Sequence, residues 1–383
     1  MKPKIVVFGA GNIGRSFVAQ VFSQAGYHVL FVDIDKNLIK NMNSIGEYKV
    51  VIKKDENPDR FISVSPVSAI DGTDSNAVIQ AVSKADIIAT AVGAGALQHL
   101  FPVIAHGVEH RKSVVDIIIA ENISDGTTYF KNGLLRHFDC EDSIDKVGLV
   151  QTSIGKMVPI MNANDIEADP LQIFSEEYNT LIVDKNGFKN CIPDIPELLP
   201  VEPIKAYVSR KLFIHNLGHA AVAYLGYQSN PETIYIWQAL EDGEVARNVR
   251  SAMEESADAL LIEYSDSFTR KDLYDHIDDL LERFRNRSLG DTIFRVGRDI
   301  ARKLSLGDRL IGALDLIRKH DLSSRSVEMV IRAALDFKKT DEVGIPFMQD
   351  EIFITHLDIM SELLSRKFRI KTEVQQSPQL LQQ

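Results

Sequence analysis

The sequence predicts an α/β fold in which a doubly wound sheet is followed by a mainly α-helical domain. Two observations support this prediction. Short apolar runs alternate with helical patterns in the first half, and from Glu202 onward the periodicity is almost purely helical. A Pro-rich stretch over residues 192–200 separates the halves, and we expect it to break regular structure. We therefore predict one domain over residues 1–195 and a second over 196–383.

The first unit of the predicted sheet joins a strand, a glycine-rich turn and a helix. The apolar run 4–8 precedes Gly9-Ala10-Gly11-Asn12-Ile13-Gly14, and a helical pattern covers 16–25. In such a G-x-G-x-x-G turn, Gly9 permits the tight turn, Gly11 lets the backbone approach a pyrophosphate, and Gly14 allows close packing of helix on strand. The pattern predicts a dinucleotide site in a Rossmann-type domain. The alternative is a turn that only caps the helix.

A carboxylate ends the second predicted strand, residues 28–32. Asp33 lies about twenty residues beyond the glycines, where a carboxylate accepts hydrogen bonds from both adenosine ribose hydroxyls. It would repel a 2′-phosphate, so the sequence favours NAD over NADP.

The later strands are predicted from further apolar runs, at 86–90, 114–119 and 146–152. Runs 171–174 and 181–184 also read as strands, with an antiparallel orientation left open. Ligands of open α/β sheets bind beyond the carboxyl ends of the strands, and Asn122 follows run 114–119. Asn122 is therefore placed to reach the nicotinamide of the cofactor. Alternatively it caps a helix that begins near Asp125.

The composition limits the classes of function. A net charge of -11 over 383 residues argues against nucleic acid or an anionic membrane as the main partner, and no apolar run approaches the roughly 18 residues of a membrane span. Cys140 and Cys191 lack metal-type spacing and are interpreted as reduced thiols of a cytoplasmic protein. The first strand begins at Lys4, so we expect no targeting segment. The histidines contain no H-E-x-x-H pair, and we expect no metal.

Lys211, Asn216 and His219 form a K-x4-N-x2-H pattern in a segment with helical character. On an α-helix they lie at about 0°, 140° and 80°, so one broad face carries all three. An amine, an amide and an imidazole on one face suit a base, an oxyanion donor and an orienting group. The alternative is a surface lysine on an amphipathic helix.

Helical patterns in the second half cover 202–225, 231–240, 243–264, 271–284, 292–304, 308–319, 324–337 and 350–368. Arg295, Arg298 and Arg302 are spaced i, i+3, i+7, so they share a face if their segment is helical. They either bind a substrate phosphate through bidentate hydrogen bonds or pair with nearby aspartates, namely Asp291, Asp299 and Asp308.

Several segments together resemble the mannitol-1-phosphate 5-dehydrogenases, within the mannitol dehydrogenase family of polyol-specific long-chain dehydrogenase/reductases. The resemblance extends to about Phe337. The matching segments are residues 8–15, 90–93, 121–122, 126–128, 182–184, 187–189, 210–213, 216, 218–220, 223–226, 252–256, 295–298, 302–304 and 308–310. Of these, the K-x4-N-x2-H segment is the most specific.

The resemblance implies a metal-independent hydride transfer between mannitol 1-phosphate and fructose 6-phosphate. Lys211 would be the general acid/base, Asn122 and Asn216 the donors to the substrate oxygen, and His219 the group that orients the substrate. It also implies that Thr90, Val92 and Gly93 contact the cofactor together with the glycine-rich turn from Gly9 to Gly14. A lysine base works near neutral pH only if burial or nearby positive charge lowers its pKa.

Two segments depart from the family pattern. Gly155-Lys156 stands where the family carries Asp-Arg, so Lys156 keeps a positive charge near the substrate but the carboxylate is lost. Thr180-Leu181 replaces Glu-Trp. An unphosphorylated polyol or a hexuronate-derived sugar acid therefore remains an alternative substrate, and a non-catalytic NAD sensor is a third interpretation. A monomer and a dimer are both consistent with the sequence.

Overall fold

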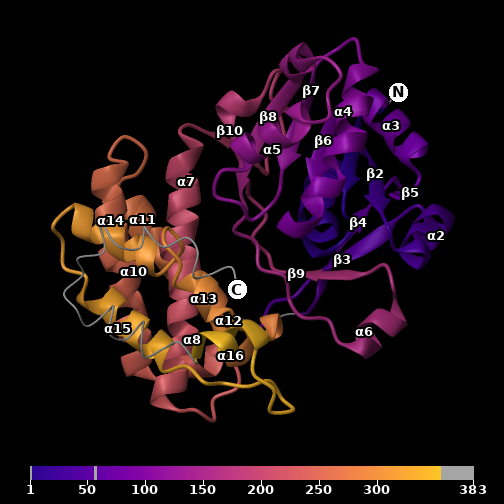
Figure 1. Cartoon of the computed structure of the whole chain (residues 1–383). Coiled ribbons are helices and arrows are strands. Elements are labelled where there is room, and N and C mark those ends of the chain that lie inside the picture. Colours follow the sequence, from indigo (N-terminus) through magenta and orange to yellow (C-terminus); the bar gives the residue numbers. More distant parts are fainter. Residues whose placement is uncertain (1, 56–57, 355–383) are drawn as a thin grey trace. The chain divides into compact units, whose positions relative to one another are not determined.

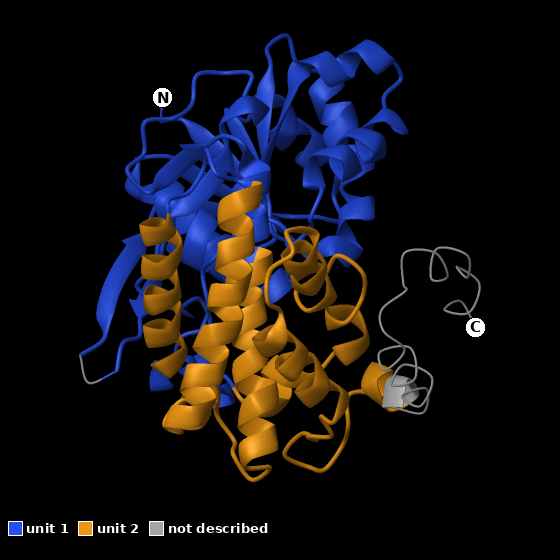
Figure 2. Cartoon of the chain, turned by 90° about the vertical axis from the view of Figure 1, so that its left-hand side faces the viewer, with its two compact units in different colours: residues 1–211, 264–269, 286–291 blue, residues 212–263, 270–285, 292–383 orange. Residues whose placement is uncertain are grey.

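The computed structural model describes residues 2–55 and 58–354, and the chain divides into two compact units (Figure 2). Unit 1 contains the chain up to Lys211 together with 264–269 and 286–291, and unit 2 contains 212–263, 270–285 and the chain from 292 onward. Unit 1 is a Rossmann-type domain built on a mainly parallel sheet, and unit 2 is helical. The predicted fold class is confirmed.

The main sheet of unit 1 has the strand order β11-β10-β8-β7-β6-β1-β2-β5 (Figure 1). Its strands are β1 (Lys4–Phe8), β2 (His28–Asp33), β5 (Val67–Asp71), β6 (Ile87–Thr90), β7 (Val115–Ile119), β8 (Val147–Ser153), β10 (Leu181–Asp184) and β11 (Leu198–Val201). The six strands from β8 to β5 run parallel, whereas β10 is antiparallel to β8. The chain leaves β1 first toward β2 and later returns to β6, so the topological switch point lies between β1 and β6.

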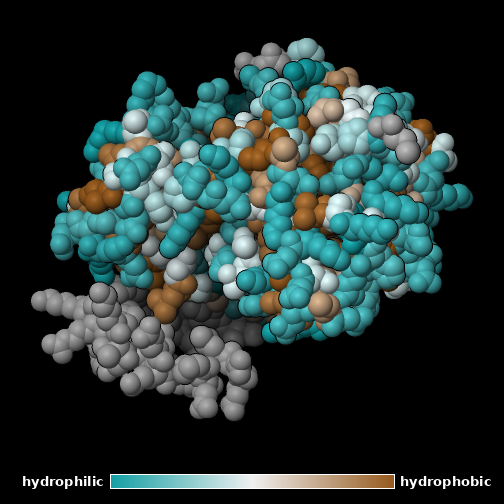
Figure 3. All heavy atoms as spheres, turned by 90° about the horizontal axis from the view of Figure 1, so that it is seen from above, coloured by the Kyte–Doolittle hydropathy of each residue, from teal (hydrophilic) through white to brown (hydrophobic). Residues whose placement is uncertain are grey.

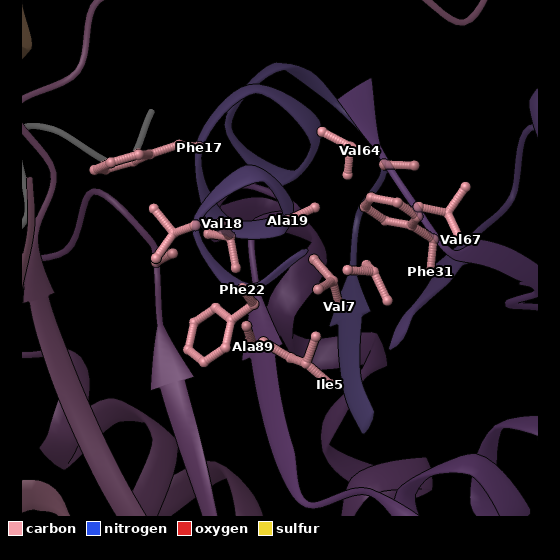
Figure 4. Packing of buried hydrophobic residues seen from close by; sticks show 14 of the residues in the cluster. Ile5, Val7, Phe17, Val18, Ala19, Phe22, Phe31, Val64, Val67 and Ala89 are labelled. Carbon is pink, nitrogen blue, oxygen red and sulfur yellow. The ribbon is translucent and has the colours of Figure 1, made fainter. Parts of the chain in front are cut away.

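Both faces of the sheet are covered, which explains the unbroken apolar runs of its strands. Along β1, Ile5 and Val7 belong to one hydrophobic cluster, and Val6 and Phe8 belong to the cluster of the opposite face. Figure 4 shows the first cluster, in which the helix after β1 contributes Phe17, Val18 and Phe22. The helices of unit 1 are η1 (Gly14–Val18), α1 (Ala19–Gln24), α2 (Lys36–Ile45), α3 (Ser75–Lys84), η2 (Ala94–His99), α4 (Phe101–Glu109), α5 (Gly126–Leu135), η3 (Glu141–Lys146), α6 (Ala163–Ala168), η4 (Lys185–Gly187), α7 (Ile204–Arg210) and η6 (Arg287–Leu289).

A second sheet in unit 1 has the order β4-β3-β9, with β3 (Tyr48–Ile52), β4 (Arg60–Val64) and β9 (Ile173–Ser175). The run 171–174 therefore leaves the main sheet and pairs parallel to β3. The expectation that 192–200 lacks regular structure is wrong at its end, because Leu198 to Pro200 lie in β11. That strand is at the edge of the sheet, where a proline removes no required ladder hydrogen bond.

Unit 2 is built from helices, and two of the predicted ones need correction. Its helices are α8 (Leu217–Ser229), α9 (Ile236–Ala239), α10 (Gly243–Glu263), α11 (Arg270–Arg285), α12 (Ile293–Gly297), α13 (Ile300–Lys303), α14 (Ile311–Lys319), α15 (Arg325–Leu335) and α16 (Met348–Ile354). The helix predicted over 231–240 is limited to the four residues of α9. The one predicted over 292–304 is broken in two, and the part of 350–368 beyond 354 lies outside the described residues.

Buried side chains bind the carbonyl oxygens at the break between α12 and α13. Lys303 Nζ donates to the carbonyl oxygens of Val296 and Arg298, and Tyr224 Oη donates to that of Gly297 at 2.8 Å. These bonds satisfy carbonyls that an uninterrupted helix would use internally. Asp299 then takes a left-handed φ of 67°.

Within the residues that the structure describes, no helix is long and apolar enough to cross a membrane. The face seen in Figure 3 is mainly hydrophilic, with hydrophobic residues scattered over it in small groups. Scattered exposed apolar residues are normal for a globular protein.

Candidate active site

The glycine-rich turn follows β1 and is fixed against the end of β2. The N–H of Gly9 donates to Val32 O at 2.9 Å, and the N–H of Ala10 donates to Asp33 Oδ2 at 2.6 Å. Gly9 has a φ of +93°, which favours glycine. Gly11 is exposed, and a Cβ placed there would meet no heavy atom within 4 Å. This open surface, at the N-terminal end of the helix that starts at Gly14, fits a pyrophosphate.

Asp33 accepts three backbone hydrogen bonds. Besides Ala10 N–H, the N–H groups of Ile34 and Asp35 donate to its Oδ1 at 2.7 and 3.0 Å. These bonds fix the carboxylate at the carboxyl end of β2, beside the glycine-rich turn. A carboxylate has about four acceptor positions, so it retains capacity for a ribose hydroxyl. The residues present therefore fit NAD.

A buried carboxylate that the sequence analysis did not assign organises the segment after β6. Glu121 accepts the N–H of Val92 at its Oε1 and the N–H of Gly93 at its Oε2, both at 2.9 Å. Burial raises the pKa of Glu121, and the two backbone donors oppose the rise. The segment with Thr90, Val92 and Gly93 lies beside the glycine-rich turn, since a Cβ on Gly9 would lie 3.0 Å from Val92 Cγ1. The N–H groups of Val92 and Gly93, however, already bind this carboxylate. An acidic residue just after a mostly apolar, buried strand was the available signal.

Asn122 and Lys211 meet inside unit 1. Lys211 Nζ donates to Asn122 Oδ1 at 2.6 Å. Asn122 does not cap the helix α5, as the alternative interpretation had it. The cap is Asp125, whose side chain accepts the N–H of Thr128 at 3.1 Å. Next to Lys211, the guanidinium of Arg210 lies over the Tyr207 ring, with 4.9 Å to the centroid.

The helix that carries Lys211 contains a π-turn at the predicted K-x4-N-x2-H pattern. α7 ends at Arg210, a π-helical segment η5 spans Lys211–Asn216, and α8 follows directly. A π-turn bonds residues five apart, and therefore brings Lys211 and Asn216 closer to one face than the 140° or so of an α-helix allows. π-Turns are rare and are often found at functional sites.

Within unit 2, the ring of His219 stacks on Phe284, with 5.1 Å between centroids and an interplanar angle of 18°. His215 is buried and makes an edge contact with the same ring at 5.7 Å, as expected for a packing residue. His215 and His219 are four residues apart, a spacing that also suits metal ligands. Among the residues described, however, no group of three or more His, Cys, Asp or Glu side chains is arranged to hold a metal ion.

The three predicted phosphate-binding arginines do not share a helix face, because the break at Asp299 separates them. Arg302 forms ion pairs with Asp299 and, at 3.4 Å, with Asp308. Of the two alternatives for Arg302, a substrate phosphate or nearby aspartates, the structure shows the aspartate pairing. Arg295 and Arg298 are exposed, and the Arg298 guanidinium lies over the Phe347 ring at 5.4 Å.

Lys156, the remaining predicted substrate residue, is buried in unit 1. Its Nζ donates to Asn179 Oδ1 at 2.9 Å and lies over the Phe17 ring, 5.2 Å from the centroid. Phe17 belongs to η1, the segment that follows the glycine-rich turn. Lys156 therefore packs against the helix of the predicted cofactor site.

A second residue that the sequence analysis did not assign is Arg15, at the start of that helix. Its side chain donates to Ala10 O at 2.7 Å and to Leu171 O at 2.9 Å, and burial lowers its pKa. Arg15 thereby connects the glycine-rich turn to the segment before β9. Its position directly after Gly14 was the only signal in the sequence.

Comparisons with known proteins agree with this architecture. A family described as the mannitol dehydrogenase Rossmann domain matches residues 3–197, and the mannitol dehydrogenase C-terminal domain matches 203–381. These matches cover most of the chain, which therefore belongs to the mannitol dehydrogenase family.

Solved structures share the fold at low identity. The mannitol 2-dehydrogenase of Pseudomonas fluorescens, in a ternary complex with NAD and D-mannitol, is 14% identical with a TM-score of 0.74, covering 96% of this chain and 87% of that chain. A D-sorbitol dehydrogenase in substrate-free form is 15% identical with a TM-score of 0.75, covering 91% and 83%. An octopine dehydrogenase with NADH and L-arginine is 13% identical with a TM-score of 0.53, covering 88% and 89%.

Proposed function

We propose that this member of the mannitol dehydrogenase family is an NAD-dependent dehydrogenase that interconverts D-mannitol 1-phosphate and D-fructose 6-phosphate. The main support for this type of reaction is the 2.6 Å hydrogen bond from Lys211 Nζ to Asn122 Oδ1. It joins an amine and an amide in the unit that holds the glycine-rich turn and Asp33. Family membership supports NAD as the cofactor and a polyol as the substrate class.

Lys211 is the proposed acid/base group. In polyol oxidation its neutral amine takes the proton of the substrate hydroxyl, and in ketose reduction the ammonium returns that proton to the oxygen. The glycine-rich turn and Asp33 would hold NAD⁺, which would supply the acceptor for the hydride that leaves the same carbon. The proton and the hydride together account for the two hydrogens that the alcohol loses.

Asn122 and Asn216 are the proposed donors to the substrate oxygen. Because Asn122 Oδ1 accepts a hydrogen bond from Lys211, the Nδ2 group of the amide is the end that donates to a developing alkoxide. Asn216 follows Lys211 by one π-turn of the same helix, which supports a second donor near the amine. His219, stacked on Phe284, is the proposed orienting group.

Arg295 and Arg298 are the proposed phosphate ligands. Both guanidinium groups are exposed in unit 2. An exposed guanidinium offers two parallel N–H donors to a phosphate. The second candidate substrate is an unphosphorylated polyol. The names of the structural neighbours, a mannitol 2-dehydrogenase and a sorbitol dehydrogenase, favour it.

The test is NADH oxidation with fructose 6-phosphate, fructose and tagaturonate in parallel, repeated with NADPH. Turnover with fructose 6-phosphate alone supports the phosphorylated substrate, and turnover only with an unphosphorylated ketose or keto-acid contradicts it. Tight NADH binding without any turnover would favour a sensor. Lys211→Ala should abolish turnover with NADH binding retained, whereas Lys205→Ala, at an exposed position of the same helix, should leave both unchanged. Residual activity above a few per cent in Lys211→Ala would remove Lys211 as the base.

A further inference from the structure

The carboxyl end of β8 connects the two segments that carry the proposed catalytic pair. Its last three residues, Gln151, Thr152 and Ser153, are only 3–6% exposed. Each has a polar side chain that donates to a backbone carbonyl outside its own strand. Buried polar side chains must be hydrogen-bonded. Here the partners are carbonyl oxygens of the segments that carry Asn122 and Lys211.

Gln151 binds the segment that carries Asn122. Its Nε2 donates to Ser124 O at 2.9 Å and to Ile123 O at 3.3 Å, the two carbonyls that directly follow Asn122. Thr152 binds the start of the same segment, since its Oγ1 donates to Ile119 O at 2.8 Å. The turn from the end of β7 to Ser124 is thereby anchored to β8 on both sides of Asn122.

Ser153 binds the segment that carries Lys211. Its Oγ donates to Tyr207 O at 3.0 Å, in the last turn of α7. The backbone N–H of Lys211 bonds to the same carbonyl and to that of Val208. A single carbonyl oxygen therefore joins the β8 hydroxyl to the main chain of the proposed base.

The strand that holds both segments is an interior strand. β8 pairs with β7 on one side and with β10 on the other, and Ser153 itself pairs with Ile182 of β10. Ladder hydrogen bonds on both sides make an interior strand more rigid than the turns and helix ends attached to it. The distance between the attachments made by Gln151 and Ser153 is then set by the strand geometry.

We propose that Gln151 and Ser153 are positioning residues that set the separation of the Lys211 amine and the Asn122 amide. The inference rests on the proposed function, in which the amine and the amide must both reach the same substrate oxygen. Proton transfer from that oxygen to the amine requires a heavy-atom separation of about 2.6–3.2 Å. A displacement of about 1 Å costs on the order of a hundredfold in rate. Loss of either attachment therefore slows the chemical step while cofactor binding is preserved.

Three variants test the proposal: Ser153→Ala and Gln151→Met, which remove the donors at similar side-chain size, and their combination. Each single change should lower kcat by about tenfold or more, with NADH affinity and the substrate KM within about twofold of wild type. The pKa of the basic group in the kcat/KM profile should shift, because the amine's surroundings change. The two changes act on one distance, so the double variant should lose less than the product of the single losses.

The controls separate positioning from general destabilisation. Ser23→Ala removes another buried serine donor of unit 1, whose Oγ donates to Ser65 O at 3.0 Å, and should leave kcat and the pH profile unchanged. Ser153→Thr keeps the hydroxyl and should restore most of kcat. If Ser153→Ala does not fold, the proposal is tested by comparing kcat and the pH profile of Gln151→Met and Ser153→Thr with those of the wild type.

The outcomes distinguish the two proposals. If Lys211→Ala is inactive while Ser153→Ala and Gln151→Met keep the wild-type kcat and pH profile, the positioning role is wrong and the proposed function stands. If both variants lose only thermal stability, as Ser23→Ala does, the positioning role is also wrong. If Lys211→Ala is active, the proposed function fails and the positioning role fails with it.

Discussion

Alanine at each of the three glycines of the dinucleotide turn should separate folding from cofactor binding. At Gly9 the φ of +93° is unfavourable for alanine, and the new Cβ would lie 2.5 Å from Ala91 O. At Gly14 the Cβ would overlap the Gly9 carbonyl oxygen. At Gly11 the φ is not in the left-handed region and the Cβ would meet no protein atom within 4 Å.

These contacts set the expected magnitudes. A left-handed alanine costs about 1–2 kcal/mol, and overpacking adds about 1–3 kcal/mol. Gly9→Ala should therefore destabilise unit 1 by about 2–5 kcal/mol. That is roughly 4–20 °C in Tm, at about 2–4 °C per kcal/mol for a domain of this size. Gly14→Ala should destabilise unit 1 by at least the amount expected for overpacking, about 1–3 kcal/mol. Gly11→Ala should change stability by no more than about 0.5 kcal/mol.

The assay pairs thermal unfolding without cofactor with a fluorescence titration by NADH. Gly11→Ala should keep the wild-type Tm but raise the Kd for NADH by about tenfold or more, because its methyl group occupies the surface on which we expect the pyrophosphate. Gly26→Ala is the matched control for strain. Its φ is +87°, and its Cβ would meet nothing within 4 Å, so the excess loss at Gly9 measures the overlap.

Two results would refute this reasoning. Wild-type NADH affinity in Gly11→Ala would mean that the cofactor does not lie on the glycine-rich turn. Equal Tm losses in Gly9→Ala and Gly26→Ala would mean that the contact with Ala91 relaxes without cost.

Three further predictions concern the cofactor, the phosphate and the pH dependence. Asp33→Ala should weaken NADH binding and raise the kcat/KM ratio of NADPH to NADH, since it removes the carboxylate that disfavours a 2′-phosphate; an unchanged ratio would place selectivity elsewhere. Arg298→Ala should raise the KM for fructose 6-phosphate several-fold, whereas Arg302→Ala should lower Tm with little effect on KM, because Arg302 is already paired; the reverse pattern would exchange their roles. Burial, with Arg309 and Arg302, lowers the pKa of Lys303 to about 7. The unfolded chain then binds more protons above that pH, so urea unfolding should show a gain of about 2 kcal/mol between pH 7 and about pH 9 that Lys303→Met lacks; an equal gain in the variant would rule out Lys303 as its source.

The sequence predicted six strands of the main sheet, β1, β2, β6, β7, β8 and β10, because their signals are local, whereas β5 and β11 were not predicted. β1, β2 and β6 are mainly apolar runs, and β7 and β8 contain apolar stretches beside buried polar residues; such strands are typical of a sheet that is covered on both faces. The second sheet was not predicted. Its strand β4 is largely exposed and alternates irregularly, and β9 is only three residues long. The pairing of β9 with β3 joins residues more than a hundred positions apart.

The helix break in unit 2 shows a related limit. Residues 292–304 have a helical pattern, yet the helix stops at Gly297 and restarts at Ile300. The carbonyls at the break are bound by Lys303 and by Tyr224, and Asp350 accepts the N–H groups of Asp299 and Ile300. Tyr224 and Asp350 lie far from the break in sequence, so local propensity contains no information about them.

By itself, the sequence determined which residue types are available for chemistry. The turn from Gly9 to Gly14, the carboxylate of Asp33 and the Lys211 pattern were all identified from spacing, because turn geometry and helix periodicity are short-range properties. Their roles in catalysis and binding remain predictions.

Only the tertiary structure decided which of these residues meet. It brings Lys211 to Asn122, 89 positions earlier in the chain, and attaches the segments of both to the end of β8. It also pairs Arg302, one of the three predicted phosphate-binding arginines, with aspartates. Such contacts depend on strand order and on the satisfaction of buried polar groups, which are properties of the whole folded chain.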